Sequence, residues 1–349
     1  MNKNIKKIGW RSAAALVVAN MIGTGVFTTL GFQLNDITST WSIIGVWLFG
    51  GVISLLGAFS YAELGTHLRK SGGEYHFISQ TIHPFWGYLS GWVSLTVGFS
   101  APIALAAMGM SAYLHKFLFL PENFLAILTV VFISVIHSFS VKQSSRFQVG
   151  FTLLKVVLIA AMIVGGLMIP NEQTGLEWSA NWVSELKTPG FAVCLIFVTY
   201  AFSGWNAAAY IVDEIDQPKK NLPIALIGGT ILVSILYVFL QMAFLKQVPI
   251  EHLRGRIEVG QVVAEHMFGG IGGQWISVII ALLLISSISA MVWVGSRVIR
   301  AMAEDYPLWN FLGHDNAQGI PVKAIWLQSA LSILLILTGS FEKILLYSG

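Results

Sequence analysis

Residues 21–26 read MIGTGV and interrupt an apolar segment that begins near the N-terminus. A second apolar segment, far along the chain, is interrupted by FSGWN at residues 202–206. Unwound backbone at the depth of the bilayer centre is tolerated only where it lines a cavity or is buried in protein. The two interruptions therefore predict two broken membrane helices around an internal site. Gly-interrupted segments at matching places in the two halves of a chain are typical of transporter binding sites.

The composition is that of a helical membrane protein. Of the 349 residues, 55% are hydrophobic and only 11% are charged, whereas soluble domains average about 25% charged residues. Apolar runs of about 20 residues recur, each long enough to cross a hydrocarbon core of ~30 Å. The net charge of +3 is small and gives no indication of a nucleic-acid partner. The single cysteine, Cys194, excludes an intrachain disulfide.

The apolar runs predict nine complete spans. They cover roughly 8–33, 40–66, 84–114, 122–140, 146–170, 189–212, 223–247, 274–302 and 321–339. The two broken helices are the first and the sixth, so they run in opposite directions across the membrane, as in two inverted five-helix repeats.

The repeats divide the chain into three parts. We expect a first repeat at 1–170, an external loop at 171–188 and a second repeat at 189–349. The second repeat needs a tenth helix, and residues 341–349 read as its beginning. We therefore expect the sequence to be a C-terminally incomplete part of a longer transporter; a natural nine-span protein is the alternative.

The basic residues predict the orientation. With a cytoplasmic N-terminus, thirteen lysines and arginines lie inside, against six outside. The inside set is Lys3, Lys6, Lys7, Arg11, Arg69, Lys70, Lys142, Arg146, Lys219, Lys220, Arg297, Arg300 and Lys323, and the outside set is Lys116, Lys187, Lys246, Arg254, Arg256 and Lys343. The positive-inside rule favours this arrangement, in a plasma or bacterial inner membrane.

The first break offers groups for both charges of a zwitterion. A broken helix exposes N–H groups where its second half begins and C=O groups where its first half ends, and the N–H end suits an anion. We expect Thr24 and Gly25 to donate to a carboxylate, and Met21 and Ile22 to supply carbonyls. Gly23 and Gly25 allow the backbone to approach closely.

The second break completes the predicted substrate site. Ser203 belongs to this break. The candidate acceptors for the ammonium group here are the backbone carbonyls of Thr199, Tyr200 and Ala201. Tyr200 or Phe202 is a candidate aromatic gate. The alternative is that the small residues serve close helix packing; the pairing of the two breaks favours binding.

Several motifs resemble the amino acid–polyamine–organocation (APC) superfamily of transporters. They are IGTGVF at 22–27, YAELG at 61–65, SGGEY at 71–75, AFSGWN at 201–206, DEI at 213–215, PKKNLP at 218–223, SRV at 296–298 and AMAED at 301–305. The resemblance covers essentially the whole chain. It implies an all-α membrane protein with the leucine-transporter-type 5+5 inverted-repeat bundle. The GWN run and Lys155 are most similar to the L-type exchangers and their bacterial relatives, a branch in which Asn206 would line the pocket and Tyr200 would align with the gate.

Lys155 lies about nine residues into its span, roughly 14 Å along the helix. A cation near the bilayer centre costs about 2.5–3.5 kcal/mol on insertion scales, so it should face the bundle interior. In related transporters a sodium ion links the first helix to the eighth. The resemblance implies that the Lys155 ammonium takes that place, near the carbonyls of Met21 and Ile22 and the hydroxyl of Ser287. Lys155 then either exchanges a proton during the cycle or stays charged in a sodium-independent exchanger; a snorkelling lysine is a third alternative.

These features predict a secondary-active transporter of neutral α-amino acids that works by alternating access. No carboxylate adjoins either break in the sequence, which favours neutral substrates over the alternative, polyamines or organic cations. A non-transporting amino acid sensor on the same fold also stays open. Phosphate-loop and metal-ligand motifs are missing from the sequence, so we expect no enzyme activity, cofactor or metal. We expect the protein to lie in a lipid bilayer. Whether it forms a homo-oligomer or binds an accessory subunit stays open.

Overall fold

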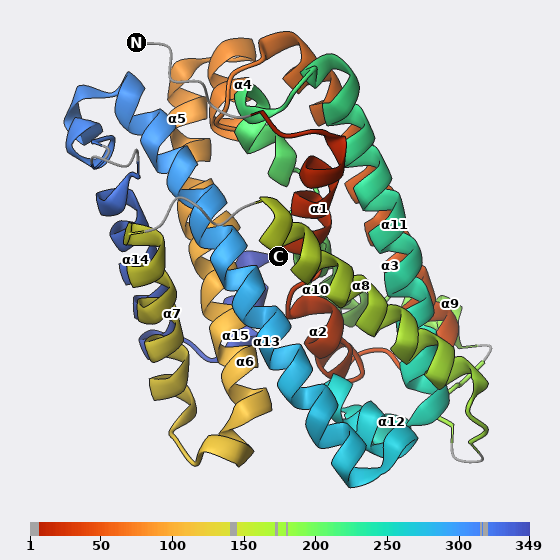
Figure 1. Ribbon diagram of the computed structural model, residues 1–349. Coiled ribbons are helices and arrows are strands. Elements are labelled where there is room, and N and C mark those ends of the chain that lie inside the picture. Colours follow the sequence, from red (N-terminus) through yellow and green to blue (C-terminus); the bar gives the residue numbers. More distant parts are fainter. Residues whose placement is uncertain (1–6, 140–144, 172–173, 179–180, 315, 317–319) are drawn as a thin grey trace.

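The computed structural model describes residues 7–139, 145–171, 174–178, 181–314, 316 and 320–349, and these ranges fold into helices (Figure 1). Eight of the described helices are long and apolar enough to cross a membrane. They are α1 Trp10–Met21 with α2 Gly25–Gln33, α3 Thr40–Leu68, α5 Pro84–Val93 with η1 Ser94–Ser100 and α6 Ala101–Leu118, α7 Glu122–Phe139, α8 Ser145–Met168, α10 Pro189–Phe202 with η2 Ala207–Glu214, α11 Pro218–Gln247 and α13 Val259–Asp305. Shorter elements are α4 Glu74–Thr81, α9 Trp182–Glu185, α12 Ile250–Leu253, η3 Pro307–Leu312, α14 Val322–Thr338 and α15 Phe341–Ser348.

The ninth predicted span is shorter than expected. It is α14, an apolar helix of 17 residues, which extends about 26 Å at 1.5 Å per residue. Pro321 stands before its first turn, and Gly339 ends it with extended backbone. Lys3, Lys6 and Lys142, used to predict the orientation, lie outside the described residues, as do 172–173 and 179–180 of the predicted external loop.

The distribution of side chains suits a lipid environment. On α3 the apolar residues Leu48, Val52, Leu56 and Phe59 lie on one side and are each more than half exposed. Lipid is as apolar as these side chains, so a membrane helix gains little by burying them. Many polar side chains lie inside instead, and some of them bond to one another. Trp47 Nε1, for example, donates to Gln33 Oε1 over 3.1 Å, with both residues fully buried.

The helices pack in two groups around the broken first span. One group holds α3, α8, α10 and α11, and the other holds α6, α7, α13 and α14. Helix α1 contacts α8 and α11 of the first group and α13 of the second. Figure 1 shows α1 and α2 between the groups, with α4 and α5 at the end of the molecule where the chain begins. Both groups therefore border the first break.

The third span is not a regular α-helix. Between α5 and α6 it forms a π-helix, Ser94–Ser100, which ends two residues before Pro102. Proline has no N–H with which to continue the regular bonding pattern, and π segments inside helices frequently occur at functional sites. This segment borders the cavity described below.

A short backbone contact joins the start of the chain to the end of the sixth span. Ile8 N–H donates to Glu214 O over 2.9 Å, and Asp216 N–H donates to Ile8 O over 2.8 Å, which forms a parallel β-bridge between Ile8 and Ile215. The segment that leads into α1 is thus bonded to the segment that follows η2.

Candidate substrate site between two broken helices

Both apolar helices break at the residues that the sequence indicates. Helix α1 ends at Met21 and α2 begins at Gly25, with Ile22 at φ −75° and ψ 84°. Helix α10 ends at Phe202, and Gly204 then adopts φ +97°. A Cβ on Gly204 would lie 2.8 Å from the backbone carbon of Asn20. The second break therefore contacts the chain directly beside the first, and only glycine permits both the φ angle and the approach.

Lys155 lies against the first break. Its Nζ is buried and donates to Ala19 O and Ile22 O, each over 3.0 Å, and to Ser287 Oγ over 2.7 Å. Ser287 Oγ also lies 3.2 Å from Ile22 O. An ammonium has three hydrogens to donate, and here each has an acceptor. Lys155 thus links α8 to the end of α1 and to α13.

Tyr237 of α11 joins the two breaks. Its buried hydroxyl lies 2.6 Å from Met21 O and 3.2 Å from Ala201 O. Met21 O also accepts from Gly23 N–H over 2.8 Å. A carbonyl oxygen has two lone pairs, so Met21 O and Ile22 O already accept two hydrogen bonds each from the protein in this conformation.

The second half of the first broken helix, α2, packs tightly against the first half of the sixth span, α10. Thr24 Oγ1 lies 2.5 Å from the Tyr200 hydroxyl, with both side chains buried. A Cβ on Gly25 would lie only 2.5 Å from Ala201 Cα. Gly25 therefore allows α2 to contact α10 here, and on this side of the breaks the predicted binding groups touch each other.

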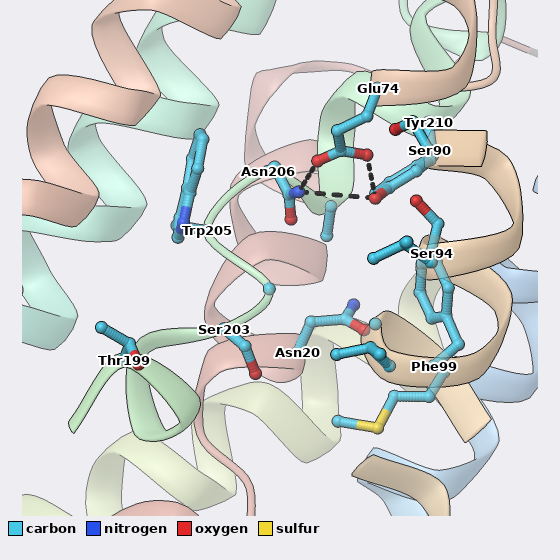
Figure 2. Close-up of a pocket in the computed structure, with 16 residues that line it drawn as sticks. Asn20, Glu74, Ser90, Ser94, Phe99, Thr199, Ser203, Trp205, Asn206 and Tyr210 are labelled. Carbon is cyan, nitrogen blue, oxygen red and sulfur yellow. Dashed lines mark hydrogen bonds between the residues drawn. The ribbon is translucent and has the colours of Figure 1, made fainter. Parts of the chain in front are cut away.

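A cavity of about 280 Å³ lies on the other side of the breaks. Sixteen residues line it, from α1, α4, the third span, the sixth span and α13 (Figure 2). The polar ones are Asn20, Glu74, Ser90, Ser94, Thr199, Ser203, Asn206 and Tyr210. Its size approaches the ~300 Å³ at which small-molecule pockets begin, so it suits a single small metabolite.

Glu74 brings a carboxylate into this cavity, so the expectation that no carboxylate lies near the breaks is wrong. Its two carboxylate oxygens accept from Asn206 Nδ2 and from the Tyr210 hydroxyl. Gly73, at φ +56°, makes this approach possible, because a Cβ there would lie 2.3 Å from the Tyr210 ring. Sequence reasoning missed Glu74 because it belongs to α4, far along the chain from both breaks; its one signal was the SGGEY motif.

Tyr75, the residue next to Glu74, holds α4 in position. Tyr75 O–H donates to Asp305 Oδ2 at the end of α13 over 2.7 Å. Burial, and then this hydrogen bond, raises the pKa of Tyr75 above its usual value. Lys70 Nζ lies 3.6 Å from the same carboxylate. These contacts hold the start of α4 against the bundle, with Glu74 directed inward.

The comparison with known protein families agrees with this geometry. The family described as amino acid permease matches residues 8–346, nearly the whole chain. The chain belongs to the amino acid permease family. The resemblance to APC-superfamily amino acid transporters is thereby confirmed.

The permease also matches individual curated proteins. It is 29% identical to the serine/threonine exchanger SteT of Bacillus subtilis over 97% of this chain and 78% of that protein. It is 31% identical to the human b(0,+)-type amino acid transporter 1 over 68% of this chain and 51% of that protein. It is 28% identical to the human large neutral amino acids transporter small subunit 2 over 99% of this chain and 66% of that protein. The matched region thus spans about half to four fifths of these relatives.

The permease structure brings some predicted site residues to the cavity and not others. Thr199, Ser203 and Asn206 line it. Eight others lie in the packed region around the breaks: Met21, Ile22, Gly23, Thr24, Gly25, Tyr200, Ala201 and Phe202. Lys155 and Ser287 are bonded to each other beside the first break. The binding and coupling roles assigned to these residues stay predictions.

We expect Tyr237→Phe to slow amino acid uptake about tenfold. The change removes the hydroxyl that lies between Met21 O and Ala201 O, and a buried hydrogen bond contributes about 0.5–1.5 kcal/mol net. The measurement is the initial rate of uptake into proteoliposomes. Tyr347→Phe, at a half-exposed position on α15, is the matched control. An unchanged rate for Tyr237→Phe would show that the bridge between the breaks is dispensable.

Proposed function

We propose that this permease transports neutral α-amino acids by alternating access and without sodium. The observation that carries the proposal is the cavity that reaches both broken helices, with Asn20 at the first and Ser203 at the second. Exposed backbone groups at such breaks match the carboxylate and the ammonium of a zwitterion. The curated names of the relatives, which include an exchanger and a large neutral amino acids transporter, support the same class.

The packed side of the breaks supports an alternating mechanism. Thr24 and Gly25, the predicted carboxylate donors, contact Tyr200 and Ala201 in this conformation. A substrate reaches their N–H groups from that side only when α2 and α10 separate. The cavity on the opposite side is already formed. We therefore assign this conformation to the state with the outer side closed, and Tyr200 to the outer gate.

Lys155 supports independence from sodium. Its ammonium joins the carbonyls at the end of α1 to Ser287 of α13, the two helices that a sodium ion links in transporters that the chain resembles. Three acceptors around Nζ stabilise the charged form of Lys155 in this conformation. This favours an exchanger over the proton-coupled alternative.

We further propose the architecture and location that the sequence indicates. Two inverted repeats, 1–170 and 189–349, would be joined by the external loop 171–188 in the leucine-transporter-type arrangement. The opposite directions of the two broken spans support this division. The excess of basic residues at one end supports a cytoplasmic N-terminus, in a plasma or bacterial inner membrane.

Uptake by purified permease in proteoliposomes tests the function. Labelled leucine, serine and threonine are supplied in sodium-free buffer, with and without internal amino acid and with and without a pH gradient. We expect uptake that requires internal amino acid. Uptake that instead follows the pH gradient would establish proton coupling. Uptake of polyamines alone, or substrate binding without any uptake, would replace the proposal by the organic-cation or the sensor alternative.

A further inference from the structure

The cavity carries one uncompensated charge. Glu74 is the only charged side chain among its sixteen lining residues, all of which belong to the described part of the chain. The side chains that donate to it are neutral: the Asn206 amide, the Tyr210 hydroxyl and the Tyr61 hydroxyl. Two described cations at the same end of the molecule pair with other carboxylates, Lys70 with Asp305 and Arg297 with Glu214.

Glu74 retains capacity to bind a further donor. A carboxylate offers about four acceptor positions. Asn206 and Tyr210 each bond to a different oxygen, and with the Tyr61 hydroxyl they take at most three of these positions. These two contacts hold the carboxylate in one orientation at the edge of the cavity. A charge that is oriented in advance binds an opposite charge at a lower entropic cost.

The position of Glu74 fits the far end of a substrate. Figure 2 shows Glu74, Tyr210 and Ser90 at one end of the lining and Thr199 and Ser203, from the second break, at the other. A zwitterion whose main-chain groups lie at the breaks would direct its side chain towards Glu74. Uncharged Ser and Asn side chains occupy the space between.

We propose that Glu74 determines the substrate specificity of this cavity by receiving the positively charged end of a basic side chain, such as that of lysine or ornithine. The inference rests on the proposed amino acid transport and extends its substrate range. Charge-assisted hydrogen bonds to a carboxylate are roughly twice as strong as neutral ones. The same charge repels acidic side chains, so aspartate and glutamate are excluded.

The test compares selectivity between a basic and a neutral substrate. Lysine and leucine are titrated against uptake of labelled leucine in proteoliposomes, and uptake of labelled lysine is measured in parallel. The quantity is the ratio of the inhibition constant for leucine to that for lysine, in wild type and in Glu74→Gln. Glutamine keeps the shape of the side chain and removes its charge. We expect the ratio to fall at least tenfold, which corresponds to about 1.4 kcal/mol.

Two further variants keep the outcome interpretable. Glu63→Gln, at an exposed position on α3, is the matched control and should leave the ratio within twofold. Glu74→Asp keeps the charge and should retain most of the preference even if Glu74→Gln is poorly folded. The proposal is overturned if lysine neither inhibits nor enters in wild type, or if the ratio is the same in wild type, Glu74→Gln and Glu74→Asp. Absence of leucine uptake in wild type would instead contradict the proposed function, and the lysine measurement would still decide the role of Glu74.

Discussion

Lys155→Ala is expected to reduce amino acid uptake at least 100-fold. The change removes three hydrogen bonds, to Ala19 O, Ile22 O and Ser287 Oγ. A buried group left without a partner costs about 1–3 kcal/mol, and the membrane interior supplies no water to replace it. The loss therefore destabilises the contact of α1 with α8 and α13 by several kcal/mol, at the break where substrate is expected to bind. The measurement is the initial uptake rate, normalised to the amount of inserted protein.

Two further variants test whether the loss of uptake is specific to Lys155. One removes a different lysine, and the other removes only one of the contacts of Lys155. Lys187→Ala removes an exposed lysine in the loop between α9 and α10 and should not change uptake. Ser287→Ala removes one of the three acceptors and should slow uptake by about tenfold, less than Lys155→Ala. Uptake by Lys155→Ala within threefold of wild type would falsify the assignment of Lys155 to the transport site.

Gly25→Val should also abolish transport while the protein still inserts in the membrane. A Cβ at position 25 would lie 2.5 Å from Ala201 Cα and 2.7 Å from Ala201 Cβ, distances that van der Waals contact does not allow. Helices α2 and α10 must then separate, so the closed arrangement of their contact is lost. We expect uptake to fall at least 100-fold and the melting temperature of the purified protein to decrease.

Gly23→Ala is the matched control for this variant. A Cβ at position 23 meets its nearest atoms at 4.0 Å, so uptake should stay within a few-fold of wild type. A second change, Ala201→Gly, should not rescue Gly25→Val, because the closest atom is the Cα of residue 201. Normal uptake by Gly25→Val, or equal losses in both glycine variants, would contradict a role for the close contact.

The sequence indicated the broken helices because small residues stand together at the middle of two apolar segments, at matching places in the two halves of the chain. It also indicated that Lys155 faces the bundle interior, and the structure buries this side chain. Its partners differ in part from the expectation: the structure uses Ala19 O and Ile22 O, while Met21 O bonds to Tyr237. Such exchanges between neighbouring carbonyls depend on helix rotation, which a single sequence does not specify.

The shape of the cavity was beyond the reach of sequence patterns. Glu74 reaches it because the start of α4 contacts Asn206 and Tyr210 of the sixth span, and Gly25 packs against Ala201 as the packing alternative describes. The third span contains a π-helix that ends at Ser100, two residues before Pro102. These features depend on contacts between residues far apart in the chain, and no local period or spacing encodes them.

The β-bridge between Ile8 and Ile215 has a consequence for motion. Two backbone hydrogen bonds tie the entrance of α1 to the exit of η2, and Arg297 of α13 is in turn paired with Glu214 over 2.9 Å. The half-helices on the cavity side, α1 and η2, are thus joined by the same hydrogen bonds. Neither can move outward alone unless these bonds break. If substrate leaves on that side, as we propose, we expect the first and sixth spans to move together during its release.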